Sequence, residues 1–369
     1  AQDHGEYPRA LALSAWGTAN MRTGGDDIAQ ALALMGARPT WDVGGGRVSG
    51  FEIMPAGVLD RPRVDVTLRV SGFFRDAFPN LIDLFDAAAR AVAALDEPEE
   101  VNPLAAARRQ AVTQALNDGV EPDHAEFLAA ARVFGCPPGA YGAGMQALLD
   151  EGGWTDDADL AAPYLAWGGW ASGGGREGFA AQDHLRRRLA GTQAVLHNQD
   201  NREHDILDSD DYYQFAGGMA AAVRAFSGGR QPAIYLNDHS RPESPKARTL
   251  QEEIGRVVRA RAVNPKWIDG VMRHGHKGAF EIAATVDYLY GFAATARCVA
   301  DHHFDAVYAA YLADDRVRDF MARVNPAALR ETAAKLRDAV ARGLWRPKSN
   351  SAHALLEELV NNAREGTAA

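Results

Sequence analysis

The chain has 369 residues, which is enough for two or three domains with ample hydrophobic cores. Its apolar fraction of 47% and charged fraction of 24% are those of an ordinary globular protein. The net charge of −10 argues against nucleic-acid and anionic-membrane partners. No apolar run approaches the roughly 18 residues that a membrane-spanning helix needs, so we expect no membrane segment.

The cysteine content and the first residues bear on where the chain acts. Its two cysteines, Cys136 and Cys298, favour buried thiols in a reducing compartment, which predicts a cytoplasmic protein. The sequence begins AQDHGEYPRA, with no initiator Met and no signal-peptide pattern. We therefore expect a fragment of a longer polypeptide.

Residues 1–100 predict an α/β unit. A buried strand at 10–15 runs into the polar loop WGTANMRTGGDD and then a helix that Gly36 ends. A second strand, VDVTLRV, is followed by the loop SGFFRD and another helix. Because ligand-holding loops follow strand carboxyl ends, we expect loops 18–27 and 71–76 to meet at one sheet edge. The expected strands are 10–15, 39–43, 50–53 and 64–70, and the expected helices are 28–35 and 77–95.

Residues 101–369 are rich in Ala and Leu and predict a mainly helical domain. The expected fold class is thus an α/β N-terminal portion followed by a mostly α-helical region with one or few extra strands. The glycine runs 44–50 and 173–178 lack nucleotide-binding patterns and predict turns, so another polypeptide must bind any ATP. The expected helices are 103–117, 122–133, 143–150, 157–168, 179–196, 250–262 and a pair within 264–295, with a strand at 233–238.

The chemistry-bearing residues concentrate in HNQDNREHDILDSDDYY, residues 197–213. If residues 196–208 are helical, His197, Asp200, His204 and Asp208 share one face, with Glu203 beside it. Carboxylates and imidazoles arranged in this way suit a borderline divalent metal ion or proton transfer near neutral pH. The run is also typical of a solvated acidic helix end. Its position between two apolar segments favours the wall of a cleft.

Several longer segments resemble a known family: ALALSAWGTANMRTGGDDIAQALALMGARP, SGFFRDAFPN, LDEPEEVNPL and NDHSRPESPKARTLQEEIGRVVRARAVNPKWIDGVMRHGHKGAFEIA. Together they resemble the large subunit of cobaltochelatase, the CobN family, which is related to the porphyrin-binding large subunit of magnesium chelatase. The resemblance covers essentially the whole chain and corresponds to the C-terminal third or so of such a subunit. GAYGAGMQALLD and YLAWGGWA are closer to the cobalt enzyme.

The resemblance implies insertion of Co²⁺, as a transient substrate ion, into the tetrapyrrole hydrogenobyrinic acid a,c-diamide in aerobic cobalamin biosynthesis. It implies two partners: an AAA+ ATPase subunit, which holds ATP and Mg²⁺, and a subunit with an integrin-type metal-binding domain. The fragment alone is expected to be inactive.

The resemblance also implies roles for the acidic cluster. Asp200, Glu203 and Asp208 match positions shared with the magnesium enzyme, whereas His197, His204 and Asp205 are particular to the cobalt branch. This contrast has a chemical reason, because Mg²⁺ prefers oxygen ligands and Co²⁺ accepts imidazole. We expect catalysis from Asp200, Glu203 and His204. The expected metal-contacting residues are His197, Asp200, Glu203, His204 and Asp208.

Ring placement requires aromatic faces for the macrocycle and arginines for its peripheral carboxylates. The expected substrate-binding residues are Trp16, Asn20, Arg22, Phe74, Arg75 and Tyr141, and further aromatic candidates are Phe73, Trp167, Trp170 and Tyr213.

Other interpretations stay open. A magnesium or nickel chelatase large subunit would use the same residue types. A metal-dependent hydrolase would retain Zn²⁺ or Mn²⁺ and act without ATP. A non-catalytic tetrapyrrole-binding scaffold would keep its ring affinity after changes to Asp200, Glu203 and His204.

Overall fold

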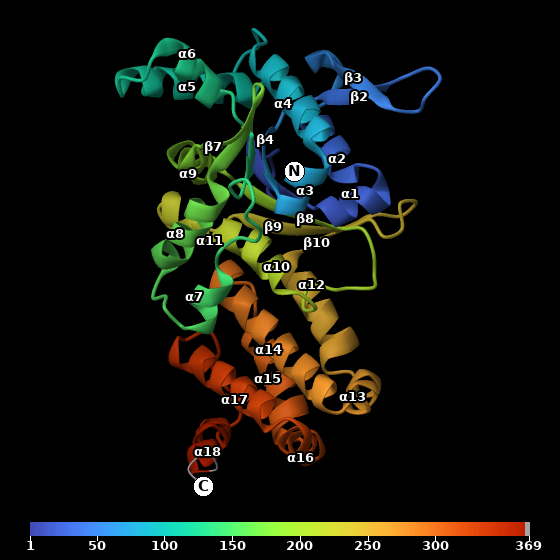
Figure 1. The fold of residues 1–369 in the computed structure, drawn as a ribbon, viewed down its shortest axis with the longest axis vertical. Coiled ribbons are helices and arrows are strands. Elements are labelled where there is room, and N and C mark those ends of the chain that lie inside the picture. The colour runs from blue at the N-terminus through green and yellow to red at the C-terminus, as the bar shows by residue number, and fades with distance from the viewer. Residues whose placement is uncertain (366–369) are drawn as a thin grey trace. The chain divides into compact units, whose positions relative to one another are not determined.

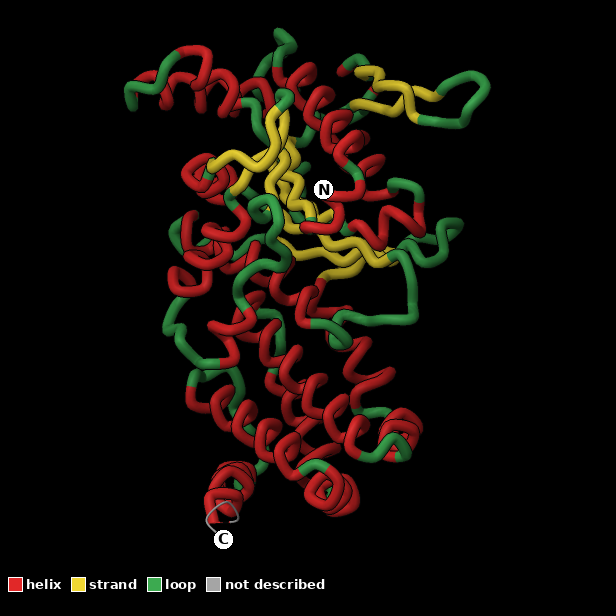
Figure 2. Tube along the Cα trace, viewed as in Figure 1, coloured by secondary structure: helices red, strands yellow, loops and turns green. Residues whose placement is uncertain are grey.

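The computed structural model describes residues 1–365, with side chains described through residue 361. The chain forms two compact units. Unit 1 comprises residues 1–201 and 218–247, and unit 2 comprises residues 202–217 and those from 248 onward. The boundary that the sequence predicted near residue 100 falls inside unit 1. The strands lie in unit 1, except that β10 crosses the boundary at residue 248, and helices make up most of unit 2 (Figure 2).

Unit 1 is built on an eight-stranded sheet with the order β10-β9-β8-β1-β4-β5-β6-β7 (Figure 1). β1 pairs in parallel with β4 and β8, and parallel pairing continues to β5 and β9. β6 and β7 are antiparallel. The strands are β1 (Ala10–Ala15), β4 (Asp65–Val70), β5 (Val133–Gly135), β6 (Trp170–Gly173), β7 (Arg176–Ala180), β8 (Ala194–Gln199), β9 (Ala233–Asp238) and β10 (Lys246–Thr249), with β2 (Ala37–Trp41) and β3 (Val48–Ile53) in a separate hairpin.

Helices cover both faces of this sheet (Figure 1). α2 and α4 lie on one face, and α8, α9 and α11 pack together on the other. The helices of unit 1 are α1 (Gly17–Thr23), α2 (Asp26–Met35), α3 (Gly72–Ala77), α4 (Pro79–Ala93), α5 (Pro103–Asn117), α6 (Pro122–Ala129), α7 (Gln146–Asp150), α8 (Asp157–Gly168), α9 (Gln182–Gly191) and α11 (Gly218–Phe226), with the 3₁₀ turn η1 (Ala56–Val58).

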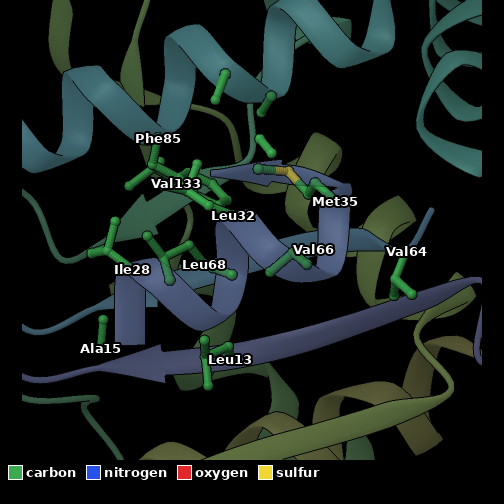
Figure 3. Packing of buried hydrophobic residues seen from close by; sticks show 14 of the residues in the cluster. Leu13, Ala15, Ile28, Leu32, Met35, Val64, Val66, Leu68, Phe85 and Val133 are labelled. Atoms are coloured by element: carbon green, nitrogen blue, oxygen red, sulfur yellow. The ribbon is translucent and has the colours of Figure 1, made fainter. Parts of the chain in front are cut away.

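The hydrophobic core lies under α2 and α4 (Figure 3). Ile28 and Leu32 recur four residues apart and so share the inner face of α2. They pack with Leu13 of β1, Leu68 of β4 and Phe85 of α4 in one cluster. Each fully buried side chain of this kind contributes roughly 1.5–3 kcal/mol through the hydrophobic effect.

The opposite face of β4 is polar yet buried. Asp65, Thr67 and Arg69 alternate along the strand with apolar residues, a pattern typical of a strand with one solvated face. All three are instead buried. Arg188 of α9 donates to Thr67 and to Asp65. These contacts replace the hydrogen bonds that the two side chains would make to water in the unfolded chain. The face is therefore closed by charge pairing rather than by apolar contact.

Unit 2 is helical, and its central α14 is the long helix that the predicted pair contained. Gly291 lets Tyr213 approach α14, because a Cβ there would lie 2.6 Å from the Tyr213 ring. No described helix of the chain is long and apolar enough to cross a membrane. The helices are α10 (Asp210–Tyr212), α12 (Leu250–Val257), α13 (Pro265–Met272), α14 (His276–Ala296), α15 (Asp301–Tyr308), α16 (Asp315–Val324), α17 (Pro326–Ala341) and α18 (Ala352–Glu365), with the π-helical turns η2 (Tyr213–Gly217), η3 (Val258–Ala262) and η4 (Ala309–Ala313).

The expected fold class is confirmed, and so are the strand at 10–15 and the helices at 103–117 and 157–168. The segments 18–27 and 71–76, predicted as loops, contain the short helices α1 and α3. Two helix predictions were also wrong. The helix expected at 179–196 is α9 alone, flanked by β7 and β8. The helix expected at 196–208 does not form, since 194–199 is β8 and a loop follows. Pairing of Leu196 with both Leu13 and Tyr235 holds this segment in the sheet.

The buried His184 of α9 generates a pH prediction. Burial first, and then the charges of Arg188 and Arg132, lower its pKa to about 3. An unfolded histidine has a pKa of about 6.5, so protons bind the unfolded chain more readily between pH 3 and 6.5. The His184 contribution to stability is therefore complete above pH 6.5 and is lost as the pH falls, by about 2 kcal/mol at pH 5.

We expect His184→Gln to remove this part of the pH dependence. Urea unfolding at pH 7 and pH 5 gives the change in the free energy of unfolding with pH for each protein. The prediction is that this change is smaller in the variant than in wild type. The exposed His274→Gln is the matched control, and a His184→Gln variant with the wild-type pH slope would contradict the prediction.

Candidate functional site at the carboxyl edge of the sheet

The parallel strands bring several loops to one edge. β1, β4, β5, β8 and β9 all end there, because parallel strands share a direction. The order in which strands are added to the sheet also changes direction at β1. β4 and β5 are added on one side of β1, and β8 and β9, later in the chain, are added on the other side. Open α/β sheets bind ligands outside the carboxyl ends of strands at such a reversal. The loops after β1 and β8 define this candidate site.

An ion pair joins these two loops. Arg22 of α1 donates through Nε and Nη2 to the two carboxylate oxygens of Asp200, at 2.5 and 2.9 Å. The Arg22 side chain is 48% exposed, whereas that of Asp200 is 5% exposed. Burial alone would raise the pKa of Asp200, but the hydrogen bonds from Arg22 and Asn201 hold it below its usual value. Asp200 is therefore an anion whose partner reaches solvent.

His197 lies beneath the loop after β1. It is 3% exposed, and its ring meets Trp16 edge-on with a centroid distance of 6.1 Å. Burial lowers the pKa of His197 to about 4, so its imidazole is neutral at physiological pH. A neutral imidazole nitrogen can accept a proton or ligate a metal ion, which a protonated one cannot.

A second polar group joins β8 to α2. Asn198 donates from one amide nitrogen to Asp27, at 2.7 Å, and to Gln30, at 2.8 Å. Burial raises the pKa of Asp27 to about 6, despite the opposing hydrogen bonds from Asn198 and the Trp16 backbone. Asp27 can therefore take up a proton close to neutral pH. In the loop after β9, His239 pairs with the neighbouring Asp26 at 2.9 Å.

Two exposed aromatic side chains stand at this edge: Phe73 on α3, which follows β4, and Tyr141 on the loop after β5. We call them the edge aromatics. Phe73 is 41% exposed and Tyr141 is 61% exposed. Each is seated on a glycine, since a Cβ at Gly17 would lie 2.5 Å from the Phe73 ring and one at Gly72 would lie 2.6 Å from the Tyr141 ring. Close packing on glycine backbone keeps both rings at the surface.

Arg75 holds the loop that carries Tyr141. It is 2% exposed and donates to the carbonyl oxygens of Cys136 and Pro137, at 2.9 and 2.7 Å. It also donates to Asp76, which accepts a hydrogen bond from the Tyr141 hydroxyl at 2.7 Å. Arg75 therefore orders the loop from within rather than presenting its guanidinium to solvent.

The predicted substrate-binding residues thus take different positions. Trp16, Arg22 and Tyr141 lie at the carboxyl edge, and Asn20 lies within α1 with 5% exposure. Phe74 is fully buried in the core cluster, and its neighbour Phe73 carries the exposed ring.

The rest of the acidic cluster belongs to unit 2. Glu203 and His204 are exposed in the loop that follows Asn201. Asp205 accepts hydrogen bonds from Arg261 at 2.6 and 2.8 Å, and Asp208 lies 3.3 Å from the same guanidinium. Within the described residues, no group of three or more His, Cys, Asp or Glu side chains is placed to hold a metal ion. The five-residue metal set stays a prediction.

Sequence reasoning missed Asp27 and Asn198. One signal was present, because an apolar run that ends in polar residues, AVLHNQ, is consistent with a buried parallel strand ending at a ligand edge. The second signal was GGDD, which places two acids in the first turn of α2.

Comparisons with known proteins agree with this architecture. The family model described as CobN/Magnesium Chelatase matches residues 1–352. The chain is 63% identical to an aerobic cobaltochelatase CobN protein of a Sinorhizobium species over 95% of its length, and 31% identical to the magnesium-chelatase H protein of Chlorobaculum parvum over 97%. A solved structure of the catalytic subunit of cobaltochelatase from Mycobacterium tuberculosis covers 99% of the chain with a TM-score of 0.93 and 46% identity.

A doubly covered, mainly parallel sheet defines an α/β protein, and in such folds the polar loops at the carboxyl edge are where ligands bind. The chain belongs to the CobN/magnesium chelatase family. It spans 27% of the length of the Sinorhizobium and Chlorobaculum relatives and 30% of the Mycobacterium chain.

The raised pKa of Asp27 generates a stability prediction. A carboxyl group whose folded pKa exceeds its unfolded value stabilises the fold at low pH, and this contribution is lost as the pH rises from about 4 to 6. At pH 8 the buried carboxylate costs about 3 kcal/mol. Asp27→Asn keeps an acceptor for Asn198 and should raise the free energy of unfolding at pH 8 but not at pH 3.5.

Urea denaturation at these two pH values measures the effect. Asp26→Asn is the control, because this neighbour is exposed and its ion pair with His239 is worth little. An Asp27→Asn variant no more stable than wild type at pH 8 would show that Asp27 carries no such cost.

Proposed function

We propose that this chain is part of the tetrapyrrole-binding large subunit of an ATP-dependent cobaltochelatase, which inserts Co²⁺ into hydrogenobyrinic acid a,c-diamide in aerobic cobalamin biosynthesis. The observation that carries the proposal is the composition of the carboxyl edge. Exposed aromatic faces, a half-exposed arginine, a neutral imidazole and an ionised carboxylate stand together there. The 63% identity to a protein named aerobic cobaltochelatase supports cobalt over magnesium, for which the identity is 31%.

The first task is to hold a flat, largely apolar ring. The edge aromatics supply faces for it, and a ring that covers them removes apolar surface from water at about 25 cal/mol per Å². Their seats on Gly17 and Gly72 keep these faces in place before the ring arrives, which lowers the entropy cost of binding.

The second task is to orient the peripheral carboxylates. Arg22 is a half-exposed guanidinium of the edge, and its planar fork already binds the carboxylate of Asp200 in a two-point contact. A ring carboxylate can replace Asp200 on Arg22 without loss of charge pairing. This exchange releases the Asp200 carboxylate at the moment the ring is in position.

The third task is to handle the ion and the pyrrolic protons. The released Asp200 offers a carboxylate oxygen to Co²⁺, and the neutral His197 offers one imidazole nitrogen. This ligand set is mixed and incomplete, so the ion can pass to the ring nitrogens. Insertion also displaces protons from the ring. Asp27 lies in the first turn of α2 at the same edge, and its pKa of about 6 lets it take up a proton near neutral pH.

The energy source lies on other subunits. The chain contains no P-loop pattern, so ATP and Mg²⁺ bind an AAA+ ATPase partner, and a subunit with an integrin-type domain completes the cytoplasmic complex. This chain on its own then binds the ring and does not turn over.

The edge aromatics generate the first functional prediction. Phe73→Ala and Tyr141→Ala should each weaken ring binding about tenfold, since each removes a contact face worth about 1.4 kcal/mol. Fluorescence quenching of the chain by hydrogenobyrinic acid a,c-diamide measures this affinity. Trp41→Ala is the control, because this aromatic is 57% exposed on the separate hairpin. Unchanged affinity in both edge variants would refute the ring site.

The exchange at Arg22 generates the second. Asp200→Asn removes the charge that occupies Arg22, so ring affinity should rise several-fold, whereas insertion by the complete complex should fall at least tenfold. A purely structural role for the pair would weaken both together. The control is Glu99→Gln, which breaks the exposed pair with Arg9 elsewhere in unit 1. Full insertion activity in Asp200→Asn would defeat the assignment.

A further inference from the structure

A separate cavity opens at the other edge of the sheet in unit 1. It has a volume of about 520 Å³ and lies between α5, α9 and the first residues of β1 and β4, Ala10 and Asp65. The candidate site follows the last residues of the same strands. Five residue steps of about 3.3 Å separate the two ends of β1, so the cavity is roughly 16 Å from the carboxyl edge. No residue of the site described above lines it.

The cavity wall carries an excess of buried positive charge. Arg132 donates to Asp65 at 2.7 Å, and Arg188 donates to the same carboxylate at 2.9 and 3.2 Å. The side chains of Arg132, Arg188 and Asp65 are 1%, 7% and 4% exposed. Two guanidinium groups therefore share one carboxylate away from water. An uncompensated buried charge is costly, so such a site favours a further anion.

The electrostatics of the three groups agree with this imbalance. Burial and the neighbouring Arg188 lower the pKa of Arg132 to about 10. Burial alone would raise the pKa of Asp65, but the two arginines hold it below its usual value. His184 also lines the cavity and is neutral, because its pKa is about 3. The histidine thus adds no charge of either sign at neutral pH.

Arg132 is held within the fold. Its Nη1 donates to the carbonyl oxygens of Ala129 and Ala131, at 2.8 and 3.1 Å, and its Nε donates to Asp65. Its Nη2 is buried and has no hydrogen-bond acceptor among the described residues. Because this guanidinium is only 1% exposed, it acts on a ligand in the cavity through its charge rather than by direct contact.

The remaining wall sets the shape of the ligand. Ala107, Ala111, Ala129 and Ala190 line the cavity with small apolar side chains. Arg187 stands exposed among the lining residues, and the acid on the rim, Asp118, is solvent-exposed and accepts a hydrogen bond from Gln114. The volume falls within the range of small-molecule sites, about 300–1,000 Å³.

We propose that this cavity is a binding site for a small anion, whose carboxylate or phosphate group pairs with Arg187 and Arg188 while a short apolar body rests on the alanines. The bound oxyanion balances the second guanidinium of the cluster formed by Arg132, Asp65 and Arg188. The site is independent of the ring site and does not rest on the proposed chelatase function.

Isothermal titration of the complete chain with inorganic phosphate and, separately, with butyrate tests the proposal at low ionic strength. We expect at least one of the two anions to bind. Arg187→Gln should weaken that binding about fivefold or more, and Ala111→Leu, which fills the cavity without changing charge, should abolish it. Arg109→Gln is the matched control, because this exposed arginine of α5 does not line the cavity.

The two titrations also distinguish between the two classes of ligand. Binding of phosphate alone identifies a phosphate site, and tighter binding of butyrate identifies a carboxylate with an apolar body. Absence of binding by both anions would overturn the proposal, and so would equal weakening by Arg109→Gln and Arg187→Gln. Retained binding in Ala111→Leu would place the anion outside the cavity and overturn it as well.

Discussion

The central position of β1 is the constraint on which unit 1 depends. β1 pairs in parallel with β4 along its full length and with β8 from Leu11 to Leu13. Because β8 arrives late in the chain, this pairing brings α1 beside residues some 180 positions away, and Arg22 meets Asp200 as a result. Without that register the two polar loops would have no reason to meet. The candidate site is thus a consequence of strand order.

The two edges of this sheet treat charge differently. At the carboxyl edge one arginine faces one aspartate, and the arginine is half exposed, so water reaches the ion pair from the arginine side. At the amino edge two buried arginines share Asp65, and the pair cannot relax into water. The first arrangement suits a step in which a carboxylate is released. The second suits the steady retention of an anion, because its removal restores an unbalanced charge in a medium of low dielectric constant.

Protonation at the carboxyl edge follows from local environment rather than residue type. Burial keeps His197 neutral, with a pKa of about 4, and raises the pKa of Asp27 to about 6. Asp200 stays ionised because Arg22 bonds to its charged form. Neighbouring groups whose pKa values are shifted apart in this way can act as base, ligand and counter-ion at the same pH. Metal insertion into a macrocycle requires such a division, since ion and protons move in opposite directions.

Part of this organisation could be predicted from the sequence. The strand at 10–15 and the helix at 28–35 were recognisable from local patterns, whereas SGFFRD, predicted as a loop, forms most of α3. The expectation that the loops after β1 and β4 meet was also sound, as the approach of Phe73 to Gly17 shows. The spacing of His197, Asp200 and His204 predicted a helix that does not form. The apolar run AVL before them is too short to distinguish a strand from a helix.

What the sequence determined by itself was therefore part of the local elements, the family resemblance and the residue types available for chemistry. Tertiary structure alone decided three matters: that residues 194–199 join the sheet, that Arg75 is buried under the loop of Tyr141, and that Phe73 rather than Phe74 reaches the surface. The physical reason is that local propensity acts over a few neighbours, whereas strand pairing and burial are set by partners far away in the chain, which the sequence does not place.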